Sequence, residues 1–232
     1  MPGKMVKEST HPLFVFTHWT NALAMLFLTI SGLYIAFPIV GGMMGIARGT
    51  HFFWMFVLLI NIIIRIIGMF TIKTCCEQGT REKDWDYKNW FPQKTNRHQM
   101  WPMIKYYLFF KKDYPITAKY AGLQKLAYWF SILLTFAVAY TGFAIWGPTQ
   151  DWWIFRFANQ IVGWLFGIGD NAHFLAGGDG LMAMRLIHHW IMWVILIFTC
   201  IHGYLSLIYG TTACKMIFLY KEDDGKPKAE EA

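Results

Sequence analysis

Four long apolar runs alternate with polar and charged stretches along the chain. The runs cover about residues 13–37, 51–72, 126–147 and 184–209. About 20 apolar residues in a helix, at 1.5 Å rise each, cross a bilayer core of roughly 30 Å. Pro38, Gly41 and Gly42 end the first run, because proline and glycine interrupt helices. The pattern predicts an all-α membrane protein: a single domain over residues 1–232 that forms a four-transmembrane-helix bundle.

The two longer connections, residues 73–125 and 148–183, are polar but contain amphipathic pieces. Residues 99–112 and 152–166 each combine aromatic or aliphatic positions with polar ones. Such segments favour helices that lie in the headgroup layer. Arg156 and its polar neighbours interrupt the second piece, so we do not expect a fifth span. No internal repeat is apparent along the chain.

Composition supports membrane insertion. The chain is 56% hydrophobic, only 15% charged, and has a mean hydropathy of +0.33, which is unlike an ordinary soluble domain. The net charge of +7 does not indicate nucleic-acid binding, because the basic residues cluster beside spans. The N-terminal tail, the 73–125 connection and the C-terminal tail hold 2, 11 and 4 Lys/Arg. The positive-inside rule therefore predicts that these three segments are cytoplasmic, in a multi-pass protein of the cell inner membrane.

The fourth run contains three histidines. His188 and His202 are 14 residues apart, which places them on one helix face with about 40° of drift and about 21 Å of rise. His189 lies roughly 100° away from His188. Ionisable groups at this depth usually serve a site, and a zinc ion would want ligands three or four residues apart. The spacing favours two stacked cofactors, one in each leaflet; the alternative is packed histidines bonded to backbone carbonyls.

Two further histidines complete the pattern. His18 begins the first span and His51 begins the second. In the predicted topology His18 and His202 lie towards the cytoplasm, while His51 and His188 lie towards the outside. Two imidazoles from different helices at one depth are the ligand set of a bis-histidine haem. We therefore predict two haems b, with iron bound by His18 and His202 in one and by His51 and His188 in the other. The chain has no C-x-x-C-H motif, so neither haem would be covalently attached.

Arginines accompany these histidines. Arg48 and Arg185 each stand three residues before a candidate ligand, and Arg65 lies deep in the second run. A buried arginine needs an anionic partner, and no Asp or Glu occurs in any of the four runs. We expect Arg48 and Arg185 to face the propionates of the outer haem, and Arg65 those of the inner one. The alternative for Arg65 is that its side chain reaches the nearby membrane surface.

The spans also carry a family resemblance. The segments concerned are FTHWTNALAMLFLTISGLYIAFP, ARGTHFFWMFVLLINIIIR, AYTGFAIWG and MRLIHHWIMWVILIFTCIHGY. They resemble the b-type cytochrome subunit of membrane-bound nickel–iron hydrogenases, most specifically in the R-x-x-H-H…H-x-Y pattern from Arg185 to Tyr204. The resemblance implies that the same four histidines bind the haems. It also implies that electrons pass from an extracytoplasmic iron–sulfur small subunit, which partners a catalytic subunit, through two haems to quinone.

A quinone site is expected on the cytoplasmic side. Residues 119–125, KYAGLQK, resemble the quinone-side segment of the formate dehydrogenase cytochromes, with Ala121 where that segment has Asn. A quinone head group needs hydrogen-bond donors as it is reduced. The predicted contacts are Tyr120, Gln124, Lys125 and Tyr204. The alternative is that the tyrosines are interfacial aromatics and Lys125 is a positive-inside anchor.

The sequence thus predicts a di-haem membrane-anchor subunit that links an extracytoplasmic oxidoreductase to quinone. A nickel–iron hydrogenase is the expected partner. A formate dehydrogenase and a thiosulfate or polysulfide reductase, whose cytochromes belong to the wider family, are the alternatives. A remote alternative from another class is a transporter whose intramembrane histidines form a proton or ion path. It is disfavoured by the lack of acidic residues in the spans and of a discontinuous helix pair.

Overall fold

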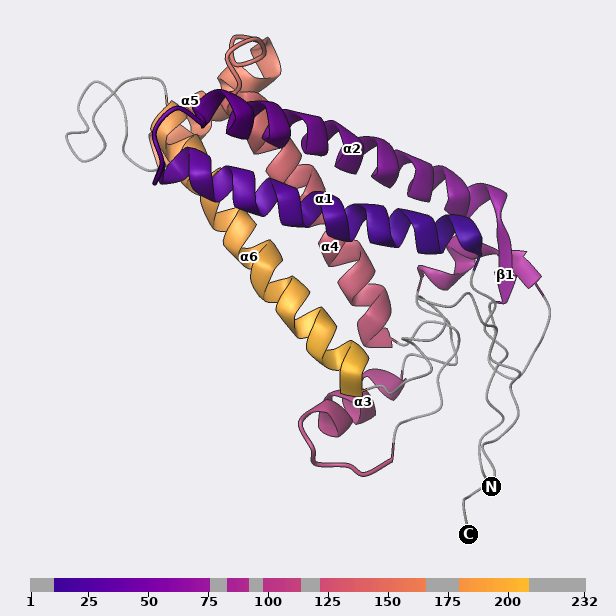
Figure 1. Ribbon diagram of the computed structural model, residues 1–232. Helices are drawn as coiled ribbons and strands as arrows, with labels where there is room; N and C mark the ends of the chain where they lie inside the picture. The colour runs from indigo at the N-terminus through magenta and orange to yellow at the C-terminus, as the bar shows by residue number, and fades with distance from the viewer. Residues whose placement is uncertain (1–10, 76–82, 92–97, 114–121, 166–179, 209–232) are drawn as a thin grey trace. The chain divides into compact units, whose positions relative to one another are not determined.

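The computed structural model describes residues 11–75, 83–91, 98–113, 122–165 and 180–208 (Figure 1). Helices dominate these residues, and the regular β structure among them is one antiparallel ribbon of two short strands. The elements are α1 (Pro12–Ala36), α2 (Met44–Thr71), β1 (Lys73–Cys75), β2 (Lys83–Trp85), the 3₁₀ helix η1 (Asp86–Asn89), α3 (Met100–Tyr107), α4 (Gly122–Ile145), α5 (Trp153–Leu165) and α6 (Leu181–Ile208).

The four predicted spans are confirmed. Helices α1, α2, α4 and α6 are each long and apolar enough to cross a membrane. All four begin before the predicted residue, and the difference is largest for α2, which begins at Met44 instead of His51. The intervening residues continue the helix although they are less apolar, since arginine is a good helix former. His51 therefore lies about two turns inside α2. The two amphipathic pieces are also helical, although α3 is shorter than the predicted 99–112.

Helices α1 and α2 run side by side as an antiparallel hairpin (Figure 1). In the half of the hairpin away from its turn, the buried Asn61 side chain donates to the Thr17 carbonyl oxygen at 2.7 Å and to Asn21 Oδ1 at 2.6 Å. Interhelical hydrogen bonds of this kind hold helices together where lipid offers no polar partner. The turn between the helices includes Gly42 at φ +83°, a conformation that favours glycine. The hairpin therefore fixes the depth of α1 residues against α2 residues.

A buried polar cluster closes the end of this hairpin. Asp86 of η1 is fully buried, and its carboxylate accepts from Arg65 Nη2 at 3.0 Å, Thr74 Oγ1 at 2.7 Å and Trp90 Nε1 at 3.1 Å. The Arg65 guanidinium lies over the Phe14 ring at 3.7 Å and near the Trp90 ring at 4.9 Å. The Arg65 guanidinium therefore takes part in one ion pair and two cation–π contacts. The connection after α2 is thus attached to both helices of the hairpin.

The start of α4 belongs to the same unit of the structure. Lys125 is buried and its ammonium donates to the Phe91 carbonyl oxygen at 2.9 Å, while Trp129 Nε1 donates to the Trp90 carbonyl oxygen at 3.0 Å. The chain divides after this point into two units, and the second comprises Phe130–His202.

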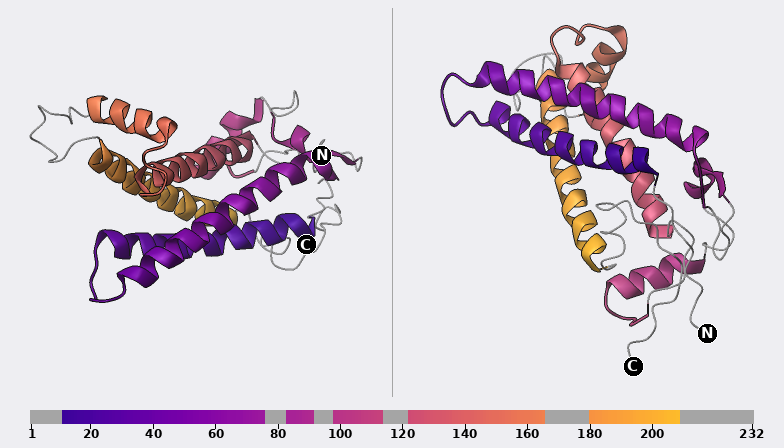
Figure 2. Two further views of the ribbon diagram at one scale, coloured as in Figure 1. Left: turned by 90° about the horizontal axis from the view of Figure 1, so that it is seen from above. Right: turned by 45° about the vertical axis from the view of Figure 1, so that its right-hand side comes forward.

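In the second unit, α4 and α6 are antiparallel and α5 lies beside the end of α4 (Figure 2). The Phe130 and Phe198 rings contact at 5.7 Å between centroids, and Ala144 and Met184 share a small core with Phe155 of α5. Tyr140 Oη and Asn159 Nδ2 tie α4 to α5 through backbone carbonyl oxygens at 2.9 and 3.2 Å. The buried face of α5 therefore packs on α4, and its other face exposes Trp153 and Trp164, as suits an interfacial helix.

We predict that Asp86→Asn lowers the stability of the protein. The change removes the buried carboxylate that pairs with the Arg65 cation, and breaking a buried pair in this way costs about 3–5 kcal/mol. The measurement is the midpoint of thermal unfolding of the detergent-purified protein, which should fall clearly below that of the parent chain.

Asp84→Asn is the matched control for this variant. Asp84 lies two residues earlier and also pairs with a cation, Lys88, but both side chains are exposed. The hydrogen bond from Lys88 lowers the pKa of the Asp84 carboxyl, yet solvent screens such surface pairs. Asp84→Asn should leave the unfolding midpoint nearly unchanged. Equal midpoints for the two variants would contradict the structural role of Asp86.

Candidate functional site

The imidazole of His51 is held by two adjacent residues of α1. Its Nδ1 lies 3.0 Å from the Ser31 hydroxyl oxygen. The next residue is Gly32, where an added Cβ would come within 3.3 Å of His51 Cε1. The ring of His51 therefore lies across the space that a side chain at position 32 would need, and the Ser31 hydroxyl fixes one edge of the ring.

The imidazole of His188 has the same surroundings in the second unit. Its Nδ1 lies 2.9 Å from the Thr141 hydroxyl oxygen of α4. The next residue is Gly142, where an added Cβ would come within 3.3 Å of His188 Cε1. The two histidines lie about two turns inside α2 and α6, counted from Met44 and Leu181.

These two arrangements define what we call the hydroxyl–glycine cradles: Ser31 with Gly32 for His51, and Thr141 with Gly142 for His188. In each case the cradle stands on one helix of an antiparallel pair and an R-x-x-H segment stands on the other. The two units therefore share a short repeated pattern. The repeat comprises only a dipeptide and one tetrapeptide pattern per unit, which is too short to stand out in the sequence. A search for Ser/Thr-Gly pairs in the span preceding each R-x-x-H would have found it.

The other two candidate ligands lie at the opposite ends of their helices. His18 is half-buried on α1, and its ring meets that of Trp19 edge-on at 5.5 Å. His202 stacks on Phe198 of α6 at 6.3 Å between centroids. His18 and His51 stand at opposite ends of the α1–α2 hairpin, and His188 and His202 are four turns apart on α6, as the sequence predicts. Pairing of His18 with His202, and of His51 with His188, stays a prediction.

His189 is engaged differently from its neighbour His188. Its Nε2 accepts a hydrogen bond from Trp193 Nε1 at 3.0 Å, one turn further along α6. The two rings are nearly perpendicular. This nitrogen therefore accepts a hydrogen bond from a residue of its own helix, which fits the prediction that His189 does not share the face of His188.

Arg65 has an anionic partner that sequence reasoning missed. Because the spans hold no acidic residue, the partners expected for Arg65 are a haem propionate or the membrane surface. In the structure, Asp86 of the connection after α2 pairs with Arg65. Only 14% of the Arg65 side chain is exposed. Its Nη1 is buried and has no hydrogen bond to any described residue. A buried N–H of this kind is costly unless an acceptor binds it.

The other predicted site residues are the two arginines expected at the outer propionates and the four residues expected at the quinone. Arg48 and Arg185 are exposed, one turn before His51 and His188. Tyr120 lies outside the described residues, and Gln124 and Tyr204 are exposed. The buried ammonium of Lys125 anchors α4 to Phe91, which agrees better with its alternative role as an anchor than with a quinone contact. The quinone site stays a prediction.

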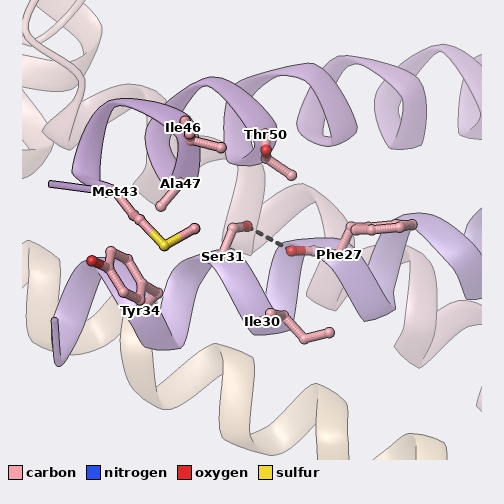
Figure 3. Close-up of a pocket in the computed structure, with 8 residues that line it drawn as sticks. All are labelled: Phe27, Ile30, Ser31, Tyr34, Met43, Ile46, Ala47 and Thr50. Atoms are coloured by element: carbon pink, nitrogen blue, oxygen red, sulfur yellow. Dashed lines mark hydrogen bonds between the residues drawn. The ribbon is translucent and has the colours of Figure 1, made fainter. Parts of the chain in front are cut away.

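A small cavity of about 180 Å³ lies between α1 and α2 beside Ser31 (Figure 3). Its lining is almost wholly apolar, with Phe27, Ile30 and Tyr34 on α1 and Ile46 and Ala47 on α2. Pockets that hold small ligands usually have about 300 Å³ or more. We therefore assign no ligand to this cavity.

The site suits a metal cofactor that is ligated by single histidines, such as haem, better than a bare metal ion. Among the described residues, no group of three or more His, Cys, Asp or Glu side chains could hold a metal ion. Instead, the imidazoles of His51 and His188 are each held by a hydroxyl of a neighbouring helix, and the buried Nη1 of Arg65 has no hydrogen bond among the described residues. Histidine ligation with cations for propionates is how membrane helices hold haem b. Fold and site together define a membrane protein of the cytochrome b type.

Comparison with known proteins agrees with this class. Residues 9–218 match the family described as prokaryotic cytochrome b561. The chain belongs to this family. It is a multi-pass membrane protein and an electron-transfer subunit of the cytochrome b561 type, for which the family implies haem b.

Three curated relatives are similar over most of their length. Each carries the name "Probable Ni/Fe-hydrogenase B-type cytochrome subunit". The protein from Rhizobium leguminosarum bv. viciae is 28% identical over 205 residues, covering 82% of this chain and 76% of its own. That from Azotobacter chroococcum mcd 1 is 27% identical over 210 residues, with 82% and 75% covered. That from Bradyrhizobium diazoefficiens is 24% identical over 204 residues, with 82% and 73% covered. The resemblance stated from the sequence is confirmed.

Proposed function

We propose that this protein is the di-haem cytochrome b subunit of a membrane-bound nickel–iron hydrogenase and passes electrons between that enzyme and membrane quinone. The observation that carries the proposal is the pair of matched hydroxyl–glycine cradles, in a chain of the cytochrome b561 family. The names of the three relatives favour a hydrogenase over a formate dehydrogenase or a sulfur-compound reductase. The partners are then an iron–sulfur small subunit and a catalytic subunit outside the cytoplasm.

His51 and His188 are the proposed axial ligands of one haem, and His18 and His202 those of the other. The equal surroundings of His51 and His188 support their assignment to one cofactor, since two ligands of one iron meet the same requirement. The positive-inside rule puts this haem on the outer side and the second haem towards the cytoplasm. Such an arrangement spans most of the bilayer, which is what transfer across it requires.

Cations complete the proposed sites. Arg48 and Arg185 stand one turn before His51 and His188 and are proposed to face the outer propionates. The Nη1 group of Arg65 has no hydrogen bond among the described residues, so a propionate of the inner haem would satisfy it. Asp86 already neutralises part of the Arg65 charge, and the effect of Arg65 on the haem would accordingly be weaker than that of an unpaired arginine.

When bound, the haems supply reversible one-electron chemistry. The chain supplies the imidazoles, holds their orientation with side chains of neighbouring helices, and surrounds them with apolar residues that exclude water. At the cytoplasmic end, Gln124 and Tyr204 offer an amide and a phenol to a quinone, together with Tyr120. We keep Lys125 in this set only as an anchor that positions Gln124 beside it.

The proposed function predicts the haem content of the protein. The purified protein should be red and contain two haems b per chain. Acid–acetone should extract all of the haem, because no C-x-x-C-H motif exists to hold it. The measurement is haem by pyridine haemochrome against protein by amino-acid analysis. A ratio near one, or haem left on the denatured chain, would contradict the proposal.

The second prediction separates the two haems. His51→Ala and His188→Ala should each remove the outer haem, and His18→Ala and His202→Ala the inner one, because each loses an axial ligand. Reduced-minus-oxidised spectra of membranes should then show half of the parental haem signal. His189→Ala is the matched control on α6 and should retain both haems. Loss of haem in His189→Ala but not in His188→Ala would reverse the assignment.

The third prediction tests the function itself. Membranes that contain the hydrogenase and the parent chain should reduce quinone with hydrogen, while His188→Ala membranes should lose this activity. The catalytic subunit should still reduce a soluble viologen dye with hydrogen, because that assay bypasses the cytochrome. The comparison uses equal amounts of hydrogenase in both membranes. Hydrogen-dependent quinone reduction at the parental rate in His188→Ala would exclude an electron path through the outer haem.

A further inference from the structure

The hydrogen bonds of Ser31 determine which nitrogen of His51 carries hydrogen. The Ser31 hydroxyl lies 2.6 Å from the Phe27 carbonyl oxygen (Figure 3). A carbonyl only accepts, and this contact is the shortest that the Ser31 hydroxyl makes, so we assign its one hydrogen to Phe27. The 3.0 Å contact between Ser31 Oγ and His51 Nδ1 is then a hydrogen bond only if Nδ1 is the donor. A neutral imidazole that is protonated at Nδ1 has its lone pair at Nε2.

Thr141 sets the same tautomer for His188. Its hydroxyl lies 2.9 Å from the Ala137 carbonyl oxygen and 3.0 Å from that of Val138. Both carbonyls only accept, and donation to one of them lets the contact with His188 be a second hydrogen bond, so we assign the hydroxyl hydrogen to the backbone of α4. In the 2.9 Å contact, His188 Nδ1–H is therefore the donor and the Thr141 hydroxyl oxygen is the acceptor. His188 also presents its Nε2 lone pair.

We propose that Ser31 and Thr141, with Gly32 and Gly142, are positioning residues that hold His51 and His188 as Nε2 ligands of one haem iron. The proposal rests on the proposed function, in which these two histidines bind the outer haem. Each hydroxyl accepts Nδ1–H and so fixes the tautomer and one edge of the ring. Each glycine leaves the space in which the ring turns to that hydroxyl, since an added Cβ would lie 3.3 Å from Cε1 in both cradles.

The same hydrogen bonds should tune the redox potential. A partner that accepts the second ring N–H raises the basicity of a ligating imidazole. A more basic ligand stabilises the oxidised iron, which lowers the midpoint potential. Because a hydroxyl is a neutral acceptor, it raises basicity less than a carboxylate would. Removing it should therefore raise the midpoint and loosen the haem.

The test replaces each hydroxyl with an apolar group of similar size in the membrane-bound protein. Thr141→Val and Ser31→Ala should lower retention of the outer haem, with a 10- to 100-fold loss of affinity typical for such partners. Haem that remains should show a positive shift of the outer midpoint in a redox titration and a changed low-spin electron paramagnetic resonance signal. Thr141→Ser and Ser31→Thr keep the hydroxyl and should restore the parental values.

Thr135→Val is the matched control. Thr135 lies on α4 and donates to the Ser131 carbonyl oxygen at 2.8 Å, as Thr141 donates to the backbone one turn before it, but Thr135 is not one of the residues that hold a histidine. This variant should keep the parental haem content and both midpoints. The inner haem, bound by His18 and His202, serves as a second control, because its retention shows that a variant has folded.

The glycines give an independent arm of the test. Gly142→Ala and Gly32→Ala should push the imidazole by a few tenths of an ångström and change the resonance signal of the outer haem only. Gly45→Ala on α2, where an added Cβ meets nothing within 4 Å, should have no effect. Parental haem content, midpoint and resonance signal in both Thr141→Val and Ser31→Ala would overturn the proposal.

The failure of this proposal can be told apart from failure of the proposed function. If His188→Ala loses the outer haem while Thr141→Val keeps it unchanged, the ligand assignment holds and the positioning role is wrong. If His188→Ala retains both haems, the ligand assignment itself is wrong, and the function proposed for this face of α6 fails with it.

Discussion

A polar side chain inside a bilayer has to find its hydrogen-bond partner within the protein, because lipid supplies none. Both units of this chain follow that requirement. Asn61 finds Asn21 and a backbone carbonyl across the α1–α2 hairpin, and Arg65 finds Asp86. His51 and His188 each find a hydroxyl of a neighbouring helix. Each partner also fixes where its helix lies, so the requirement sets the packing as well as the polar groups.

The histidine cradles connect this packing to electron transfer. A ligating imidazole has to keep one nitrogen for the metal and satisfy the other, and a hydroxyl that already donates to its own helix can only accept. The glycine that follows it admits the ring. Two antiparallel helix pairs with little sequence in common arrive at this arrangement. That recurrence supports the same role for His51 and His188 more strongly than their depth in the membrane does.

Arg65 illustrates where reasoning from one span alone fails. The spans lack acidic residues, so the sequence offered a propionate or the membrane surface as the partner of the guanidinium. Asp86 lies 21 residues further along, on a polar connection, and nothing local marks it as buried. Folding of β1, β2 and η1 against the hairpin brings it to Arg65. Lys125 is a similar case, because its contact with Phe91 follows from the position of that same connection.

The sequence by itself determined the four spans, the family, and the spacing of His188 and His202 on one helix face. These features depend on hydropathy and helical period, which are local properties of the chain. The tertiary structure decided which side chains hold the histidines, the counter-ion of Arg65 and the anchoring of Lys125. Those contacts join residues 20 to 47 positions apart in the sequence. They depend on how helices pack against each other and on how a polar connection folds over their ends, and a hydropathy pattern does not specify either.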